Sequence, residues 1–170
     1  MYYMLVRGPF NLKWGENQIE DVEEVSIEHE VDSEDFQTVQ GQTIEVDGAY
    51  KVSATITLLA SDIAALAALL PQYYVANGET MSTGETVENA DGAIDVKAAS
   101  CDESIVFNNL DISSCGDPAN VLRLVNCRTK IDGIEIDNKL QKVMIKFVGE
   151  SDANEATVQF FIDGTLNPIS

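Results

Sequence analysis

The sequence predicts a mainly β chain that carries one α-helix. Segments such as Tyr50–Leu59 and Ala156–Asp163 alternate apolar and polar residues with the period of a half-buried strand. Turn-forming pairs such as Asp132-Gly133 and Asp137-Asn138 separate the later segments. Residues 61–70 instead combine helical spacing with a run of Ala and Leu. We therefore expect one β-rich domain over residues 1–170.

The strand at residues 50–59 leads directly into this helix. Its apolar side consists of Tyr50, Val52, Ala54, Ile56 and Leu58. Ser61 is the expected helix cap, Asp62 places negative charge in the first turn, and Pro71 ends the helix. The predicted core side of the helix consists of Ile63, Leu66, Ala67 and Leu70.

The helix has no charged residue after Asp62, although a surface helix normally presents charges to water. We expect it to be covered on both sides, by its own sheet and by a second surface. That second surface is either a partner subunit or another part of the same domain. The candidate inter-subunit residues are Ile63, Ala64, Ala65, Leu66 and Ala68.

The net charge of -19 on 170 residues excludes some classes of partner. Binding to phosphates or to an anionic membrane surface needs Lys and Arg, so neither is expected. A solubilising surface, a cation-binding surface and a surface that does not retain DNA all remain compatible with this charge. The 45% apolar content indicates a folded core rather than a disordered acidic tail.

The cysteines do not suggest a metal site, because the sequence has no CxxC pair and only one His. Cys101, Cys115 and Cys127 are expected to be free thiols, although a bond between the first two stays open. The N-terminus lacks the features of a signal peptide, and no apolar run is long enough for a membrane span. We expect a cytosolic product.

Residues 1–15 are expected to form an N-terminal arm with a short strand at Tyr2–Val6, and Trp14 is expected to plug one end of the core. Residues 19–31 predict a strand with a polar and an apolar face. Its carboxylate-bearing positions are Glu24, Glu28 and Glu30, and adjacent positions on such a face lie about 7 Å apart. His29 falls on the apolar side, where a lone His is usually a core residue.

Residues 32–49 are predicted to form either an extended hairpin or an ordinary pair of edge strands. Residues 77–92 are rich in Gly, Thr, Ser, Glu and Asn, and they predict a mobile loop or a hairpin tip. Residues 108–120 read as a turn-rich connection. The other expected strands are Tyr73–Ala76, 93–98, 104–107, Val121–Cys127, Thr129–Ile136, Leu140–Gly149 and Glu155–Asp163.

The charge changes sign along the chain. Residues 14–50 contain twelve acids and no Lys or Arg, whereas residues 123–146 contain six bases and three acids. A ring of identical subunits would place these regions against each other, but both could equally face solvent.

The sequence predicts no catalytic residues, no cofactor and no metal site. It has no GxSxG, P-loop, GxGxxG or EF-hand pattern, and a single His makes a catalytic triad improbable. Paired carboxylates carry little information among 29 acids. A structural or binding role is expected.

The segment FQTVQGQTIEVDGAYKVSATITLLASDIAAL resembles the tail tube proteins (major tail proteins) of tailed bacteriophages and related contractile devices. The order of elements is similar over most of the chain: a short arm, an acidic strand, a long hairpin, a long strand leading into one Ala/Leu-rich helix, and several later strands.

This resemblance implies a β-sandwich or barrel-like body of two antiparallel sheets with one flanking helix. It implies hexameric rings that stack into a hollow tube, a hairpin (residues 32–49) that reaches the neighbouring ring, and a helix that lies against the body or a neighbour. Glu24, Glu28 and Glu30 become candidate lumen-facing acids that repel DNA in transit.

The resemblance also implies a place in the virion, assembly in the host cytoplasm, and other tail proteins as partners: a possible sheath, the tape measure, the baseplate and the terminator. The type of tail and the strands that face the lumen stay open. The alternatives are a tail terminator or baseplate tube initiator on the same fold, and an acidic DNA-mimic inhibitor.

Overall fold

The computed structural model describes residues 9–59, 62–97, 105–114, 121–136, 141–151 and 156–161. The predicted strand at Tyr2–Val6, the predicted cap Ser61, and both Cys101 and Cys115 lie outside these residues. The elements are β1 (Phe10–Trp14), β2 (Asn17–Ile19), β3 (Val22–Gln37), β4 (Thr43–Leu59), α1 (Ile63–Leu69), the 3₁₀ turn η1 (Pro71–Tyr73), β5 (Tyr74–Val75), β6 (Ala93–Ile94), β7 (Asn108–Ser114), β8 (Val121–Ile136), β9 (Gln141–Ser151) and β10 (Val158–Phe161).

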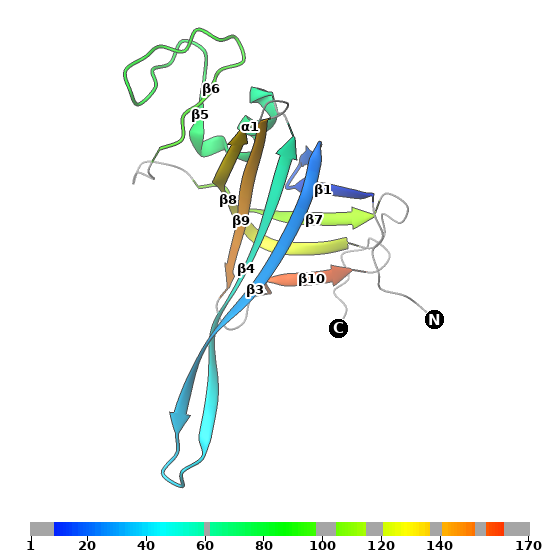
Figure 1. The fold of residues 1–170 in the computed structure, drawn as a ribbon, viewed down its shortest axis with the longest axis vertical. Coiled ribbons are helices and arrows are strands. Elements are labelled where there is room, and N and C mark those ends of the chain that lie inside the picture. Colours follow the sequence, from blue (N-terminus) through cyan, green and yellow to red (C-terminus); the bar gives the residue numbers. More distant parts are fainter. Residues whose placement is uncertain are drawn as a thin grey trace.

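The mainly β prediction with two antiparallel sheets and one helix is confirmed for the described part of the chain. The larger sheet has the strand order β2-β1-β7-β8-β9-β4-β3, with β10 also paired to β8. The smaller sheet consists of β5 and β6. In Figure 1 strands β3, β4 and β9 cross over β1, β7 and β10, so the larger sheet folds into two layers.

Strand β8 joins the two layers. Its first half pairs with β7 and β10, and its second half pairs with β9. Asn126, between the halves, has a φ of 47°, a left-handed conformation that Asn adopts more readily than most residues. Gly149 on β9 packs against this bend, where an added Cβ would lie 2.9 Å from the Val125 carbonyl oxygen.

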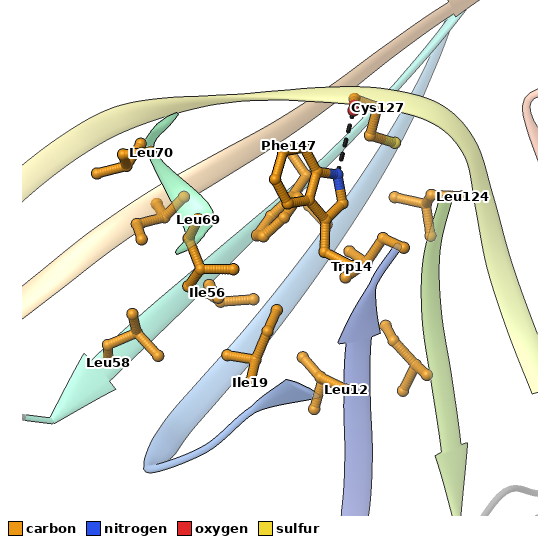
Figure 2. Packing of buried hydrophobic residues seen from close by; sticks show 14 of the residues in the cluster. Leu12, Trp14, Ile19, Ile56, Leu58, Leu69, Leu70, Leu124, Cys127 and Phe147 are labelled. Carbon is orange, nitrogen blue, oxygen red and sulfur yellow. Dashed lines mark hydrogen bonds between the residues drawn. The ribbon is translucent and has the colours of Figure 1, made fainter. Parts of the chain in front are cut away.

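The core lies between the layers, and α1 covers one end of it (Figure 2). Its largest fully buried side chains are Trp14, Phe147, Ile56, Leu70, Leu110, Leu124, Ile145, Val52 and Cys127. The Trp14 ring meets Phe147 edge-on at 6.1 Å, and its Nε1 donates to the Cys127 carbonyl oxygen at 3.2 Å. These contacts link β1, β8 and β9 across the two layers.

The prediction of an arm over residues 1–15 is wrong for Phe10–Trp14. This segment is a strand paired on both sides, with β2 and with β7. Leu12 and Trp14 alternate inward against Asn11 and Lys13, a short period-two pattern. Trp14 therefore belongs to the centre of the core rather than to a plug at its end.

The predicted alternation in Tyr50–Leu59 is confirmed, because Val52, Ala54 and Ile56 are fully buried. The predicted cap is wrong: Asp62 caps α1, and its Oδ1 accepts from the Ala65 N–H at 2.8 Å. The helix begins one residue later than the pattern suggested.

The predicted core side of the helix is also partly wrong. Leu69 and Leu70 are the buried residues, and Leu66 packs beside them. Ile63 and Ala67 are only half-buried.

The described part of the chain contains no helix long and apolar enough to cross a membrane.

Four other segments differ from expectation. Residues 108–114 form β7 rather than a connection, because Leu110 and Ile112 point inward between polar residues. Strand β8 is continuous, and Gly133 marks a bulge opposite β9 instead of a turn. Of the strand expected at 93–98, Ala93–Ile94 is present, and residues 105–107 are not a strand.

Residues 77–92 fold back as a hydrogen-bonded loop. Gly78 N–H donates to the Val87 carbonyl oxygen at 2.8 Å, and an isolated bridge joins Thr80 to Thr86. The Ser82 N–H donates to the Asp95 carboxylate at 2.8 Å, which lowers the pKa of Asp95. The loop is therefore closed on itself in the structure, while its mobility stays a prediction.

Candidate assembly edges

One layer of the body is a four-stranded sheet, in the order β3-β4-β9-β8, with an open edge on each side. Strand β3 pairs only with β4 among the described residues. The second half of β8 pairs with β9, while its other side meets Gln72, whose Nε2 donates to the Thr129 carbonyl oxygen at 2.7 Å. From residue 130 to residue 136 no described backbone group pairs with that side. We call these the β3 edge and the β8 edge.

The polar face of this sheet changes charge from one edge to the other. Glu24, Glu28 and Glu30 are exposed on one face of β3, as the alternation predicted. The same face carries hydroxyl groups on β4, from Ser53, Thr55 and Thr57. Opposite these hydroxyls, towards the β8 edge, it carries Lys146, Lys130 and Arg128.

Two bases of the predicted positive segment are engaged within the chain. Arg123 forms a two-point ion pair with Asp111 at 2.6 and 3.1 Å, and Lys142 lies 2.9 Å from Glu23 of β3. Within the described residues, Arg128 and Lys130 form no ion pair, so they carry the positive charge of the β8 edge.

The core-facing side of the sheet is incompletely covered at both edges. Ile27 and Val31 on β3 are 39% and 37% exposed, and Ile134 and Ile136 on β8 are 53% and 78% exposed. All four lie on the side of the sheet that is buried at its centre. Each edge thus presents an apolar row on one face and charged residues on the other.

The expectation that His29 is a core residue is wrong. It is exposed at the β3 edge, its Nε2 lies 3.3 Å from Thr157 Oγ1, and its ring lies 5.6 Å from that of Tyr50. The apolar side of an edge strand is only partly covered, which the alternation alone does not reveal.

The helix residues predicted to meet a partner divide into two groups. Leu66 packs on the core of its own chain, whereas Ala64 and Ala65 are exposed and Ile63 and Ala68 are half-buried. A groove of about 190 Å³ separates the helix from β2 and β4. Its lining includes Ala65, Ala68 and Leu69 together with Asp21 and Asp62.

Residues 32–49 are the distal half of the β3–β4 hairpin, which extends away from the body in Figure 1. Phe36 pairs with Ile44 and Glu34 pairs with Val46, so these four share one face. Asp35, Glu45 and Asp47 share the other. An extended hairpin is one of the two structures predicted for residues 32–49, and the alternation of Ile44, Glu45, Val46 and Asp47 accounts for its two faces.

Among the described residues, no three His, Cys, Asp or Glu side chains lie where they could hold a metal ion. Cys127 is free and buried, and burial raises the pKa of its thiol to about 12. A thiol in this state is protonated and unreactive at neutral pH.

Of three comparisons with known proteins, only the one with solved structures found matches. No family model matches the chain, and no curated protein matches it. The structure is similar to a sheath/tube terminator in the extended state of PVC, an extracellular contractile injection system. Their TM-score is 0.54 at 10% sequence identity, over 94% of this chain and 97% of that chain.

Two further structures have lower scores. A tube-terminating cap of the anti-feeding prophage gives a TM-score of 0.48 at 11% identity, over 88% of this chain and 95% of that chain. A chain of the PVC sheath–tube complex gives 0.45 at 10% identity, over 85% and 88% of the two chains. At 10% identity the terminator match shows a shared fold.

Proposed function

We propose that this protein is a ring-forming structural subunit of the tube of a phage tail or phage-tail-like particle. In this proposal six copies form a ring, and rings stack into a hollow conduit. The observation that carries the proposal is the pair of open, complementary edges on the β3-β4-β9-β8 sheet.

The number of strands makes ring closure possible. Successive strands in the order β3-β4-β9-β8 are all antiparallel, so β3 and β8 run in opposite directions. Rotating a copy about a ring axis preserves these directions. The β8 edge of one copy therefore meets the β3 edge of the next as an antiparallel pair, which closes the sheet into one barrel without free edges.

The chemistry of the two edges supports the same contact. Pairing them places Ile134 and Ile136 beside Ile27 of the next copy, which extends the hydrophobic core across the interface. On the other face it places Lys130 beside the glutamates of β3. Unpaired edges would instead present open backbone groups to any other strand.

In such a ring the polar face of the sheet lines the lumen, because the second layer covers the opposite face. The proposed acidic lining, Glu24, Glu28 and Glu30, would then form stripes that alternate with stripes containing Lys130 and Lys146. The acids would balance these bases and keep DNA phosphates from being retained.

Replacement of the three glutamates by Gln tests this lining. It leaves the lysines of the same face unbalanced, so DNA ejection from particles assembled with the variant should become slower. Unchanged ejection kinetics would contradict the DNA-conduit role of these residues, while leaving the ring itself in place.

The partners in this proposal are the neighbouring copies and the other tail proteins, and the location is the particle. We propose no enzymatic role. A second candidate is a tube terminator on the same fold, which the similarity to the PVC terminator favours because it extends over nearly the full length of both chains. A terminator would form single rings that do not elongate.

Negative-stain electron microscopy of the purified protein over a concentration series tests the proposal. Hollow tubes with a regular axial repeat support the tube role, and isolated rings support the terminator role. Lys130→Glu should prevent both, whereas Lys13→Glu, the same charge change on an exposed position of β1, should not. Single chains at every concentration would overturn the proposal and favour the acidic DNA-mimic alternative.

A further inference from the structure

The β8 edge offers its backbone groups to a new strand at defined residues. Gln72 Nε2 donates to the Thr129 carbonyl oxygen at 2.7 Å on this edge, so the backbone groups of Thr129 point away from β9. Because these groups alternate in direction along a strand, those of Ile131 point the same way. Gln72 therefore occupies one outward carbonyl, and Ile131 is the next residue that is open to a new strand.

The same alternation identifies the outward residues of the β3 edge. The Leu59 N–H donates to the Asp21 carbonyl oxygen at 2.9 Å, so Leu59 and every second residue before it on β4 point towards β3. One of these residues, Thr55, pairs with Ser26. The backbone groups of Ser26 therefore face β4, and those of the next residue, Ile27, face the open edge.

We propose that Ile131 of one copy pairs with Ile27 of the next copy, and that this pair fixes the register of the contact between the β8 edge and the β3 edge. We call this contact the seam. Both residues lie on the core-facing side of the sheet. The inference rests on the proposed function, because it needs neighbouring copies in a ring, and it adds the residues that determine how they align.

A bulge in each strand keeps this register along the whole seam. Strand β8 has one extra residue between Ile131 and Gly133, and β3 has one extra residue between Val22 and Glu24. The two extra residues compensate each other. Ile136, the last residue of β8, then meets Val22, the first residue of β3, so the two strands end together.

The side chains match on both faces in this register. On the core-facing side, Ile134 meets Val25 and extends the apolar row. On the polar face, Lys130 meets Glu28, an acid that lies opposite Ser53 on β4 rather than opposite a base. The seam thus joins an unpaired base to an acid without a base across from it.

Neighbouring registers fit less well. A shift of β3 by two residues in one direction places Lys130 opposite Ser26, which removes the charge match. A shift in the other direction places Lys130 opposite Glu30, which already lies opposite Lys51, and it brings His29 into the apolar row. A shift by one residue would turn the apolar residues to the polar face.

A designed disulfide tests the register. Lys130→Cys and Glu28→Cys are introduced together into a protein with Cys101→Ser and Cys115→Ser, which leaves only buried Cys127. This pair exchanges no hydrogen bonds across the seam, so its Cα atoms would lie about 4.5 Å apart, within the range of a disulfide. Under mild oxidation of assembled protein, we expect a ladder of linked chains on a non-reducing gel. Lys130→Cys combined with Ser26→Cys or with Glu30→Cys is the matched control and should link far less.

A charge exchange provides a second measurement that keeps both side chains long. Lys130→Glu should prevent rings, and adding Glu28→Lys should restore them, whereas adding Glu30→Lys should not.

A third measurement uses the one unfavourable pair of the seam. This register places Glu135 opposite Glu24 of the next copy, and like charges directly opposite each other are destabilising. Glu135→Gln should therefore lower the protein concentration at which rings form by about twofold or more. In the register that pairs Lys130 with Glu30, Glu135 would face Ser26, and the substitution would have little effect.

The outcomes separate the register from the ring. Rings of the unsubstituted protein combined with linkage through Ser26, through Glu30 or through none of the three positions would overturn the register and leave the proposed function standing. Single chains of the unsubstituted protein at every concentration would overturn both.

Discussion

Strands β3 and β4 are paired along nearly their whole length, yet their two halves stand in different surroundings. In the proximal half, Val52, Ala54 and Ile56 are fully buried between the two layers. In the distal half, Ile44 and Val46 alternate with the same period but are 48% and 49% exposed. The local pattern is alike in both halves, and among the described residues only the proximal half of β4 pairs with a further strand, β9.

This difference separates residues that stabilise the subunit from residues that would stabilise an assembly. Burial of Val52, Ala54 and Ile56 is complete in one chain, so their contribution to folding does not depend on a neighbour. The distal side chains add almost no burial until another surface covers them. Substitutions in the two halves should therefore affect different measurements.

The largest expected effect is on the subunit. Phe147→Ala removes a fully buried ring that packs edge-on against Trp14, and it should lower the free energy of unfolding by about 3–5 kcal/mol. Urea denaturation of the unassembled protein measures this change. Phe36→Ala, the same substitution in the distal half, should change it by no more than about 0.5 kcal/mol. Similar losses in both variants would show that the hairpin folds against its own body.

A smaller effect is expected at the helix. Asp62→Ala removes the side chain that accepts from the Ala65 N–H, and it should cost about 1 kcal/mol in the same experiment. Ser61→Ala is the control, because Asp62 already caps α1. An equal loss in the control would place the helix start at Ser61 after all.

The distal half should show the opposite balance. Phe36→Ala with Ile44→Ala should leave the free energy of unfolding within about 0.5 kcal/mol of the unsubstituted protein while weakening stacking of rings. Gln37→Ala with Thr43→Ala alters the adjacent cross-strand pair on the other face and should stack normally. Sedimentation velocity at matched concentrations distinguishes the two outcomes, and equal stacking would remove the apolar face from the assembly.

The sequence predicted those parts of the fold that depend on local period. Alternation located β4, and helical spacing located α1 to within two residues at its start. It missed β1 and β7 because their turn-forming and polar residues resemble loops, although Trp14 and Leu110 become core residues once β8 pairs with β7. Those strands are defined by pairing between distant residues, which a local pattern does not contain.

The candidate site was predictable in composition and not in arrangement. The acidic face of β3 follows from alternation at Glu24, Glu28 and Glu30. That Lys130 and Lys146 occupy the same face depends on the order β3-β4-β9-β8, which no local feature specifies. The exposure of His29 has the same cause, because an edge strand and a central strand can share one pattern.

The smallest expected effect is the absence of a reaction at Cys127. Burial raises the pKa of this thiol to about 12 from an ordinary value of 9.0, so the folded protein holds the proton more tightly than the unfolded chain does. The resulting stability is present below pH 9 and is lost as the pH rises towards 12.

Alkylation by iodoacetamide, followed by mass spectrometry, makes this visible in a protein with Cys101→Ser, Cys115→Ser and Gln37→Cys. Below the pKa of the hairpin cysteine, its reaction should become about tenfold faster for each unit by which the pH is raised, because the thiolate is the nucleophile. Cys127 should stay unmodified from pH 7 to pH 9 unless denaturant is added. Comparable labelling of both thiols at pH 8 would mean that the two layers separate readily and expose Cys127. The buried contacts of Trp14 and Phe147 would then not keep the body closed, and the body would protect a thiol little better than the exposed hairpin does.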